Sequence, residues 1–514
     1  MYWCKIAQTQ AEFDAIAKLN YATFVEEIPQ HERNESKRKI DRFHAENTYL
    51  VVYKETEIVG MLAFRDQRPF SIDEKIGAVE NYLAEEICVK LCEIRLLAVS
   101  KEYRTGRVLL KLAQALYSFA YEKGYSAALI SGTTREEKLY TQMGFTQFAP
   151  AIGTEEAKFL PMVLTRQQFE RSLQQRLATG SSTFYPGPVK QFGEMVYSDI
   201  SHRSLTFQAL FQRMRQTLLE ISQANHVATL VGTGTLANDV LLGQLSAQKL
   251  GHGLILSNGE FGERLIEQAK QWDLAFDTVQ NVWGNSFDSN IIKEHLQTGA
   301  YKWLLFVHGE TSTGTCNDME MLARLAKRYD VLLCADCISS FGALPFSLES
   351  CYLATAVSGK AVGAMSGLAF VFSQNLAKPA TLPVYVNLAN YQGEHVPFTM
   401  PAALVANVEA ALQAYPARFE QLQARFHALQ QLPIVENYQL QTSSYPMIVT
   451  LKLPEEYRNL WLDLKLNGLY LHGDSLYLRQ KNFMQLAVIQ PDFEAAFKQL
   501  KEVLSYYEQC KKHF

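Results

Sequence analysis

The sequence predicts an α/β protein of two modules, in which the larger, second module is a mostly parallel sheet flanked by helices in three layers. Three observations predict this fold class. The chain has 514 residues, enough for two or three domains of about 150 residues each. Its C-terminal two-thirds alternates short apolar runs with stretches of helical period. A polar segment near residue 175 separates this region from the rest.

Composition and charge narrow the function classes. Hydrophobic residues make up 48% of the chain, charged residues 20%, and the net charge is −4, so nucleic acid is not an expected partner. The N-terminus mixes charged and apolar residues, and no stretch reaches about 18 apolar residues, so we expect a cytoplasmic protein without a membrane partner. The close pair Cys334 and Cys337 lacks a second ligand pair, so we expect buried thiols and no metal site.

Residues 1–168 predict a small α/β domain. An amphipathic helix comes first, and residues 48–66 follow as two strands around a tight turn. Residues 93–100 are the next strand, and residues 109–124 predict a helix that ends at a glycine, as helices commonly do. Residues 169–183 then lose their apolar face and end in small polar residues, which is typical of a linker.

The larger module is predicted by apolar strands that end in glycine or polar residues. These strands lie at residues 227–234, 253–259, 303–310 and 331–337, with a helix at 319–329 between the last two. In parallel sheets of this kind ligands bind at the carboxyl ends of the strands. The residues that suggest chemistry in this module all follow such strands, so we expect one site at that edge.

The turn after the first of these strands places Gly232, Thr233, Gly234 and Thr235 before a helix, where free backbone N–H groups favour a phosphate. A plain turn would read the same way. The next strand ends add Phe261, an aromatic side chain that could lie against a flat ring, and then His308, Glu310 and Thr311 in a hydroxyl-rich loop. Singly, each of these residues is equally compatible with core packing.

Asp336 and Lys360 are the two charged residues in the most apolar surroundings. Asp336 ends an apolar run, where a carboxylate is costly unless a cation such as a protonated ring nitrogen pairs with it. Lys360 lies between apolar stretches, where a lysine either extends to solvent or forms a covalent bond aided by a lowered pKa.

The order of these features resembles the class V, fold-type I aminotransferases, which use pyridoxal 5′-phosphate (PLP). The resemblance covers residues 180 to about 505, includes the opening segments 184–189 and 198–211, and is greatest to the alanine–glyoxylate, serine–pyruvate and 2-aminoethylphosphonate transaminases. It implies that Lys360 holds the cofactor aldehyde and then moves the proton, and that Asp336 pairs with the ring nitrogen. It implies cofactor contacts from the following residues: Thr233, Gly234, Thr235, Phe261, Thr311, Ile338 and Ser358.

The resemblance also implies a homodimer, because Thr399 matches a threonine that reaches the phosphate from the neighbouring subunit. Val396 stands where the family often has a tyrosine. The arginine that binds the substrate carboxylate is missing as well, since Met484 or Gln485 occupies its place. Unless Arg479 substitutes, the clamp on a carboxylate is absent, and the substrate is then not an ordinary α-amino acid.

In the first module, residues 93–116 resemble the central motif of GNAT acyltransferases, in which a glycine-rich turn at a helix N-terminus receives the pyrophosphate of acyl-CoA. The resemblance implies Arg104 and Gly106 as phosphate contacts and acetyl-CoA, another acyl-CoA or an acyl carrier as donor. It implies Tyr140 as the acid that protonates the leaving thiolate, with Glu93 as a base. The turn departs from the family, because Leu109 replaces its last glycine.

These inferences together predict four regions and a combined function. The regions are a GNAT-like domain at 1–168, a linker at 169–183, a PLP-binding domain at 184–430 and a small α+β subdomain at 431–514. The predicted function is amino transfer between an amine or amino acid and a 2-oxo acid or aldehyde, fused to N-acylation of an amine. The alternative is a PLP-dependent lyase, decarboxylase or racemase whose GNAT-like domain is a catalytically dead binding module.

Overall fold

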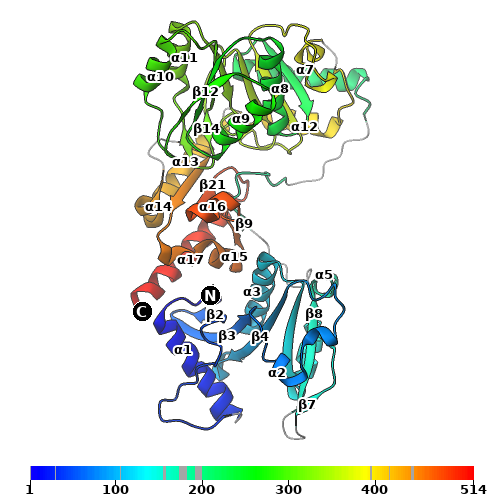
Figure 1. Cartoon of the computed structure of the whole chain (residues 1–514), viewed down its shortest axis with the longest axis vertical. Helices are drawn as coiled ribbons and strands as arrows, with labels where there is room; N and C mark the ends of the chain where they lie inside the picture. Colours follow the sequence, from blue (N-terminus) through cyan, green and yellow to red (C-terminus); the bar gives the residue numbers. More distant parts are fainter. Residues whose placement is uncertain are drawn as a thin grey trace. The chain divides into compact units, whose positions relative to one another are not determined.

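The computed structural model describes residues 2–28, 31–104, 106–153, 158–172, 182–191, 200–393, 396–415, 417–440 and 445–513 (Figure 1). The chain forms two compact units. The first unit contains Met1–Ser182 together with two C-terminal segments, Asn459–Tyr470 and Ala495–Phe514. The second unit contains Thr183–Arg458 and Leu471–Glu494. The first boundary falls at the end of the predicted linker, whereas the predicted subdomain is divided between the two units.

The first unit is built around a mixed sheet. Its described strands are β1 (Tyr2–Ile6), β2 (Thr48–Lys54), β3 (Glu57–Arg65), β4 (Leu91–Val99), β5 (Ala127–Thr133), β6 (Thr146–Gln147), β7 (Ile152–Gly153) and β8 (Lys158–Thr165), in the order β1-β2-β3-β4-β5-β8-β6 with β7 beside β8. The helices include α1 (Gln10–Tyr21), α2 (Asp73–Ile76), α3 (Arg107–Lys123), α4 (Glu137–Gln142) and α5 (Arg166–Ser172). The predicted hairpin and the predicted helix ending at Gly124 are both confirmed.

Strands β4 and β5 are parallel but separate along their length. They pair only from Leu91 opposite Ala127 to Glu93 opposite Leu129, although both strands continue. A register shift in the β3–β4 ladder and a left-handed Leu96, with φ of 55°, mark an irregularity in β4 just beyond this point. The later halves of these two strands therefore do not share a ladder.

The C-terminal segments complete the core of the first unit. Leu462 and Leu466 of α15 (Leu460–Leu466) join the buried cluster formed by β1, β2 and α3. The backbone N–H of Ile6 donates to Oδ1 of Asp463 over 2.7 Å. Further along, α17 (Phe493–His513) places Tyr506 so that its ring stacks on Trp3, with centroids 6.4 Å apart.

We expect Leu466→Ala to destabilise the first unit by about 2–5 kcal/mol, because removing a buried leucine side chain leaves a cavity. Leu466 is 3% exposed, whereas Leu110 on α3 is 47% exposed, so Leu110→Ala is a matched control that should change stability little. Urea unfolding followed by tryptophan fluorescence, to which Trp3 contributes, measures both variants. Equal midpoints for the two variants would show that α15 does not belong to this core.

The second unit contains a sheet of seven strands among its described residues. In sheet order these are β10 (His226–Val231), β18 (Leu368–Ser373), β17 (Leu353–Val357), β16 (Leu332–Asp336), β13 (Trp303–Val307), β11 (Gly253–Ser257) and β12 (Phe276–Gln280). Strands from β17 to β12 are parallel, and β18 is antiparallel to both of its neighbours. The mostly parallel sheet predicted from the apolar runs is confirmed.

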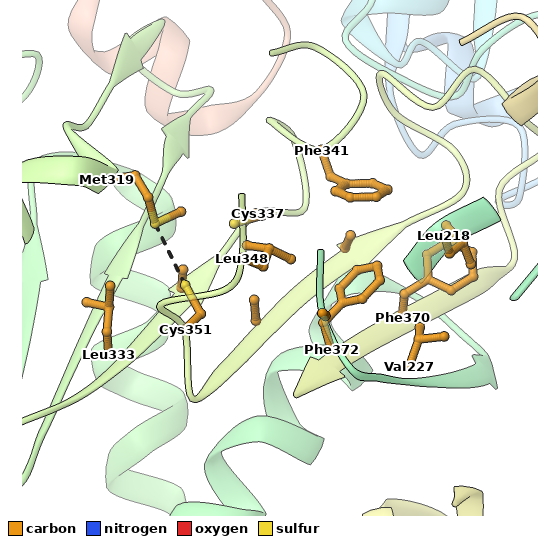
Figure 2. Close-up of a cluster of buried hydrophobic side chains, with 14 of the residues drawn as sticks. Leu218, Val227, Met319, Leu333, Cys337, Phe341, Leu348, Cys351, Phe370 and Phe372 are labelled. Atoms are coloured by element: carbon orange, nitrogen blue, oxygen red, sulfur yellow. Dashed lines mark hydrogen bonds between the residues drawn. The ribbon is translucent and has the colours of Figure 1, made fainter. Parts of the chain in front are cut away.

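Helices cover both faces of this sheet, which gives the three predicted layers. They are α7 (Leu205–Ser222), α8 (Gly234–Ala247), α9 (Glu260–Gln271), α10 (Ser289–Gln297), α11 (Met319–Arg328) and α12 (Ala402–Gln413). Leu254 and Leu256 of β11 belong to one buried cluster and Ile255 to another, as strand alternation requires. Figure 2 shows part of the first cluster, in which Cys351 lies beside Met319 and the rings of Phe341 and Phe370 each lie near that of Phe372.

Further elements of the second unit include the helices α13 (Ala417–Gln430), α14 (Pro433–Tyr438) and α16 (Leu476–Lys481) and the short strands β14 (Gly309–Glu310), β15 (Thr315–Cys316), β19 (Ile448–Lys452) and β21 (Phe483–Ala487). Strand β9 (Ser182–Thr183) lies across the unit boundary, and β20 (Leu469–Tyr470) belongs to the first unit. Strands β19 and β21 pair antiparallel. Across the part of the chain that the structure describes, no helix is both long and apolar enough to span a membrane.

Candidate active site

The turn between β10 and α8 brings a helix N-terminus to the carboxyl edge of the sheet. Thr233 is the N-cap of α8 in extended conformation and makes no side-chain capping bond, and Thr233 and Thr235 are both exposed. The first N–H groups of a helix have no partner within the helix, so they can bind an anion. A Cβ at Gly234 would lie 2.6 Å from Cδ1 of Ile338, so only glycine permits this close approach.

Asp336 lies at the end of β16 and is 5% exposed. Its Oδ1 accepts the backbone N–H of Ile338 over 2.9 Å, and its Oδ2 accepts the side-chain amide of Asn238 over 2.8 Å. Thr355 in turn donates to Oδ1 of Asn238 over 2.8 Å. Burial raises the pKa of Asp336, while both hydrogen bonds and the charge of Lys360 oppose the shift. The site therefore holds a fixed, buried carboxylate that a nearby cation would stabilise.

Lys360 lies in the loop after β17, the sheet neighbour of β16. Burial lowers its pKa to about 8, with Arg264 adding to the shift and Asp336 opposing it. Ser358 shapes the loop, because its hydroxyl donates to the carbonyl of Met365 over 2.7 Å and accepts from Leu368. These two hydrogen bonds hold the loop that carries Lys360, and a direct role of Ser358 toward a cofactor stays a prediction.

The start of α9 is fixed by a fully buried acid, Glu310. The carboxylate accepts N–H groups from Phe261 over 3.4 Å and Gly262 over 3.0 Å, and the hydroxyl of Ser312 over 2.5 Å. Burial raises the pKa of Glu310 to about 7. Arg264 lies over the Phe261 ring at 5.0 Å from its centroid, so this ring is held on one side.

His308 lies two residues before Glu310, just after the end of β13, and it is buried and neutral at neutral pH. Burial lowers the pKa of His308 to about 4, and its Nδ1 lies 3.0 Å from the hydroxyl of Ser340. The ring of Phe346 packs edge-on against it, with centroids 4.4 Å apart. These contacts are those of core packing.

The opening segment of the second unit lies against Lys360. Gly187 has φ of 145°, and a Cβ there would lie 3.4 Å from Cδ of Lys360. The side chain of Gln490 holds this segment by donating to the carbonyls of Tyr185 and Pro188, each over 2.9 Å. The entry segment was identified from its sequence, but its contact with Lys360 was not.

Gln485 of β21, one of the two residues expected at the place of the family's arginine, is fully buried. Its amide nitrogen donates to the backbone carbonyl of Thr311 and, over 2.9 Å, to the hydroxyl of Thr450. Its carbonyl oxygen lies 2.7 Å from Nδ1 of His472. Met484 is buried on the same strand, and Arg479 is exposed on α16. Nothing in the sequence singled out His472.

Thr399, predicted to reach the phosphate of a partner, and Val396, which stands where the family often has a tyrosine, lie in the segment before α12. Thr399 is exposed, and Val396 packs against the buried cluster of Figure 2. A role of Thr399 through a second subunit stays a prediction.

In the first unit, Gly106 is the N-cap of α3 with φ of 82°, a value that favours glycine. Arg104, the predicted phosphate contact, is instead paired with Glu27 through both terminal nitrogens, and its Nε donates to the carbonyl of Val99 over 3.0 Å. Leu109 lies in the first turn of α3 and is partly buried. Gly106 therefore has the left-handed backbone that favours glycine, but Arg104 is engaged by Glu27.

The structure gives different surroundings to Tyr140 and Glu93, the predicted acid and base of acyl transfer. The ring of Tyr140 packs on β5, where a Cβ at Gly132 would lie 2.8 Å from its Cδ2, and burial raises its pKa. Glu93 is fully buried, and its carboxylate accepts from the hydroxyl of Ser71 over 2.6 Å and the N–H of Ile72 over 3.0 Å. Glu93 thus fixes the turn at 70–72, a structural role.

Two family models match this chain. The GNAT acetyltransferase domain matches residues 19–114, and the class V aminotransferase model matches residues 190–387. The first match includes Arg104 and Gly106 but ends before Tyr140, and the second includes Asp336 and Lys360.

Relatives with several different names match the second unit. A 2-aminoethylphosphonate–pyruvate transaminase of Klebsiella pneumoniae is 32% identical over 169 residues, which are 32% of this chain and 46% of that protein. A transaminase of the same name from Pseudomonas entomophila is 30% identical over 40% of this chain and 61% of that protein. A soluble hydrogenase small subunit of a Synechococcus strain is 31% identical over 45% and 64%, respectively. The chain thus spans about half to two-thirds of the length of these relatives.

Solved structures share the fold of the second unit. An aspartate aminotransferase of Thermus thermophilus superposes with a TM-score of 0.56 at 24% identity, covering 63% of this chain and 99% of that chain. An alanine–glyoxylate aminotransferase of Nostoc gives 0.55 at 22% identity, covering 63% and 94%. The larger unit therefore has the fold-type I aminotransferase architecture.

Proposed function

We propose that this chain, which carries a class V aminotransferase domain behind an N-terminal GNAT acetyltransferase domain, is a PLP-dependent aminotransferase that moves an amino group between an amino donor and a 2-oxo acid or aldehyde acceptor. The observation that carries the proposal is the pair Asp336 and Lys360. Asp336 ends β16, Lys360 follows the adjacent parallel strand β17, and the charge of each acts on the pKa of the other.

The residues present fit PLP. The open N-terminus of α8 suits its phosphate, Asp336 suits the ring nitrogen, and Lys360 suits its aldehyde. Ile338 and Phe261 would lie on the two ring faces, and Thr311 would be near the ring hydroxyl. When bound, this group supplies an electron sink for the charge left on the substrate carbon.

The chain's own residues then have separate tasks. With its pKa lowered to about 8, Lys360 can supply a neutral amine near neutral pH and can carry a proton to and from the substrate carbon. Asn238 and the N–H of Ile338 hold the carboxylate of Asp336 in one orientation. Gly187 lies against the lysine side chain, so a larger residue at this position would crowd it.

The test is the absorption spectrum of the PLP-loaded protein before and after addition of alanine, serine, glutamate or 2-aminoethylphosphonate. The last compound is included because relatives of the second unit carry its name. We expect one donor to convert the cofactor to pyridoxamine phosphate, and a matching acceptor to restore it. Substrate turnover without that conversion would instead indicate a lyase, decarboxylase or racemase.

For the N-terminal domain we propose binding of an acyl-CoA or acyl carrier, with N-acylation of an amine as the reaction. Two observations favour a second candidate, a binding module without catalysis: Arg104 is paired with Glu27, and Glu93 is committed to the turn at 70–72. Release of free thiol from acetyl-CoA in the presence of an amine measures the reaction. No release despite measurable acetyl-CoA binding would select the binding module.

We also propose a homodimer in which Thr399 completes the phosphate site of the partner. Its exposure in the segment before α12 supports this role.

A further inference from the structure

One wall of the site near Lys360 is built from the first residues of the second unit, Tyr185 and Gly187, and from its C-terminal segment, which contributes His472. Gly187 contacts Lys360, and two residues earlier the ring of Tyr185 meets the His472 ring edge-on, with centroids 6.2 Å apart at 77°. On its other side His472 meets the ring of Tyr477, at 6.3 Å. A substrate joined at the lysine position would therefore have His472 and its hydrogen-bond partners as a neighbour.

The hydrogen bonds of this wall fix where its protons lie. A backbone carbonyl only accepts, so the group that Gln485 directs to Thr311 is its NH₂, and its oxygen faces His472. That oxygen also only accepts, so Nδ1 of His472 carries a proton. Nε2 of His472 lies 2.7 Å from the hydroxyl of Ser475. Burial lowers the pKa of His472, so the ring is neutral and its Nε2 accepts from Ser475.

This chain of groups has no donor left for an anion. Both amide protons of Gln485 are used, by Thr311 and Thr450, and His472 is uncharged. Arg264, whose charge acts on Lys360, is paired with Glu260 over 2.9 Å. A carboxylate placed beside Gln485 and His472 would be desolvated against neutral groups that are already satisfied, which is costly.

We propose that the amino donor is a primary amine with no carboxylate on its amine-bearing carbon, and that the chain Gln485–His472–Ser475 excludes α-amino acids. The inference rests on the proposed aminotransferase function and narrows its substrate class. In the first half-reaction the donor's nitrogen would pass to the cofactor and the remainder would leave as an aldehyde or ketone, with one water consumed. Because the acceptor uses the same pocket, it would be an aldehyde or ketone without a carboxylate on its carbonyl carbon, and it would take up this nitrogen with one water released.

The test uses two stable conjugates, made by reducing the adducts of PLP with ethylamine and with alanine, which differ by one carboxylate. Calorimetric titration into the cofactor-free full chain measures binding without requiring turnover. We expect the ethylamine conjugate to bind at least about 10-fold more tightly. Equal affinities, or tighter binding of the alanine conjugate, would overturn the inference and leave the proposed function intact. Failure of both conjugates and of pyridoxamine phosphate to bind would refute the proposed function and this inference with it.

A substitution at Gln485 is expected to shift the preference from the ethylamine conjugate toward the alanine conjugate. Gln485→Arg supplies the guanidinium that the wall lacks, and we expect it to shift the affinity ratio toward the alanine conjugate by about 10-fold or more. Gln485→Met, which also removes the amide but adds no charge, is the control and should keep the preference for ethylamine. Binding of pyridoxamine phosphate by both variants shows that they are folded. An unchanged ratio in a folded Gln485→Arg protein would place the carboxylate elsewhere and contradict the assignment.

Discussion

Replacing Lys360 with alanine is expected to abolish aminotransfer, lowering the rate by roughly 10⁴-fold. Positioned acid–base groups contribute up to about that factor, and Lys360 is also the group that would hold the cofactor covalently. Lys378→Ala, a matched change at an exposed lysine, should keep the wild-type rate. The rate is measured as conversion of the bound cofactor by an amino donor.

A second readout separates covalent attachment from folding. Borohydride reduction of the loaded protein should add the mass of the cofactor to the peptide that contains Lys360 in the wild type, and no such mass should appear in Lys360→Ala. The variant should still bind pyridoxamine phosphate, because Asp336 and the N-terminus of α8 are unchanged. Labelling of a different lysine would assign the covalent role to that residue.

The strand ends of the second unit could be predicted because buried parallel strands leave an uninterrupted apolar signal. Val331 to Ala335 read as such a run, and the polar residue that ends it is Asp336. Since parallel strands place their carboxyl ends at one edge, the sequence also predicted that Asp336 and Lys360 would lie near each other. Their mutual effect on pKa agrees with this prediction.

The contacts that tune the site could not be predicted, because they depend on residues that are distant in sequence and ordinary in type. Asn238 is an unremarkable helix residue until the fold places its amide 2.8 Å from Asp336. Gln485 contacts Thr311, which lies 174 positions earlier. No periodicity or spacing rule connects such positions, and His472 carries no local signal of its function.

The assignment of the C-terminal segments shows the same limit. The segment Leu460–Leu466 has a leucine at every second position, an alternation typical of a strand, yet it forms a helix, and its pattern does not state which core receives it. Ion pairing has no spacing rule either: Arg104 fits a phosphate turn by position, yet the fold pairs it with Glu27, 77 residues away.

Replacing Asp336 with asparagine is expected to lower the aminotransfer rate by about 100–1,000-fold, because the fixed charge that holds a protonated ring nitrogen is lost. The cofactor-free variant should, however, be at least as resistant to heat as the wild type. Burial raises the pKa of Asp336, so the folded state disfavours its ionised form, and a neutral side chain relieves that cost. Thermal unfolding and turnover are measured on the same preparations.

Opposite signs for these two measurements are what identify a functional carboxylate, because a variant that merely misfolds would lose stability and rate together. Asp318→Asn is the matched control: Asp318 is the exposed N-cap of α11, and asparagine caps a helix equally well, so both measurements should stay near wild type. A stable Asp336→Asn protein with full activity would show that the electron sink does not depend on this charge. A variant that lost both would mean that Asp336 serves Asn238 and the N–H of Ile338, the two groups that bind it in the folded chain.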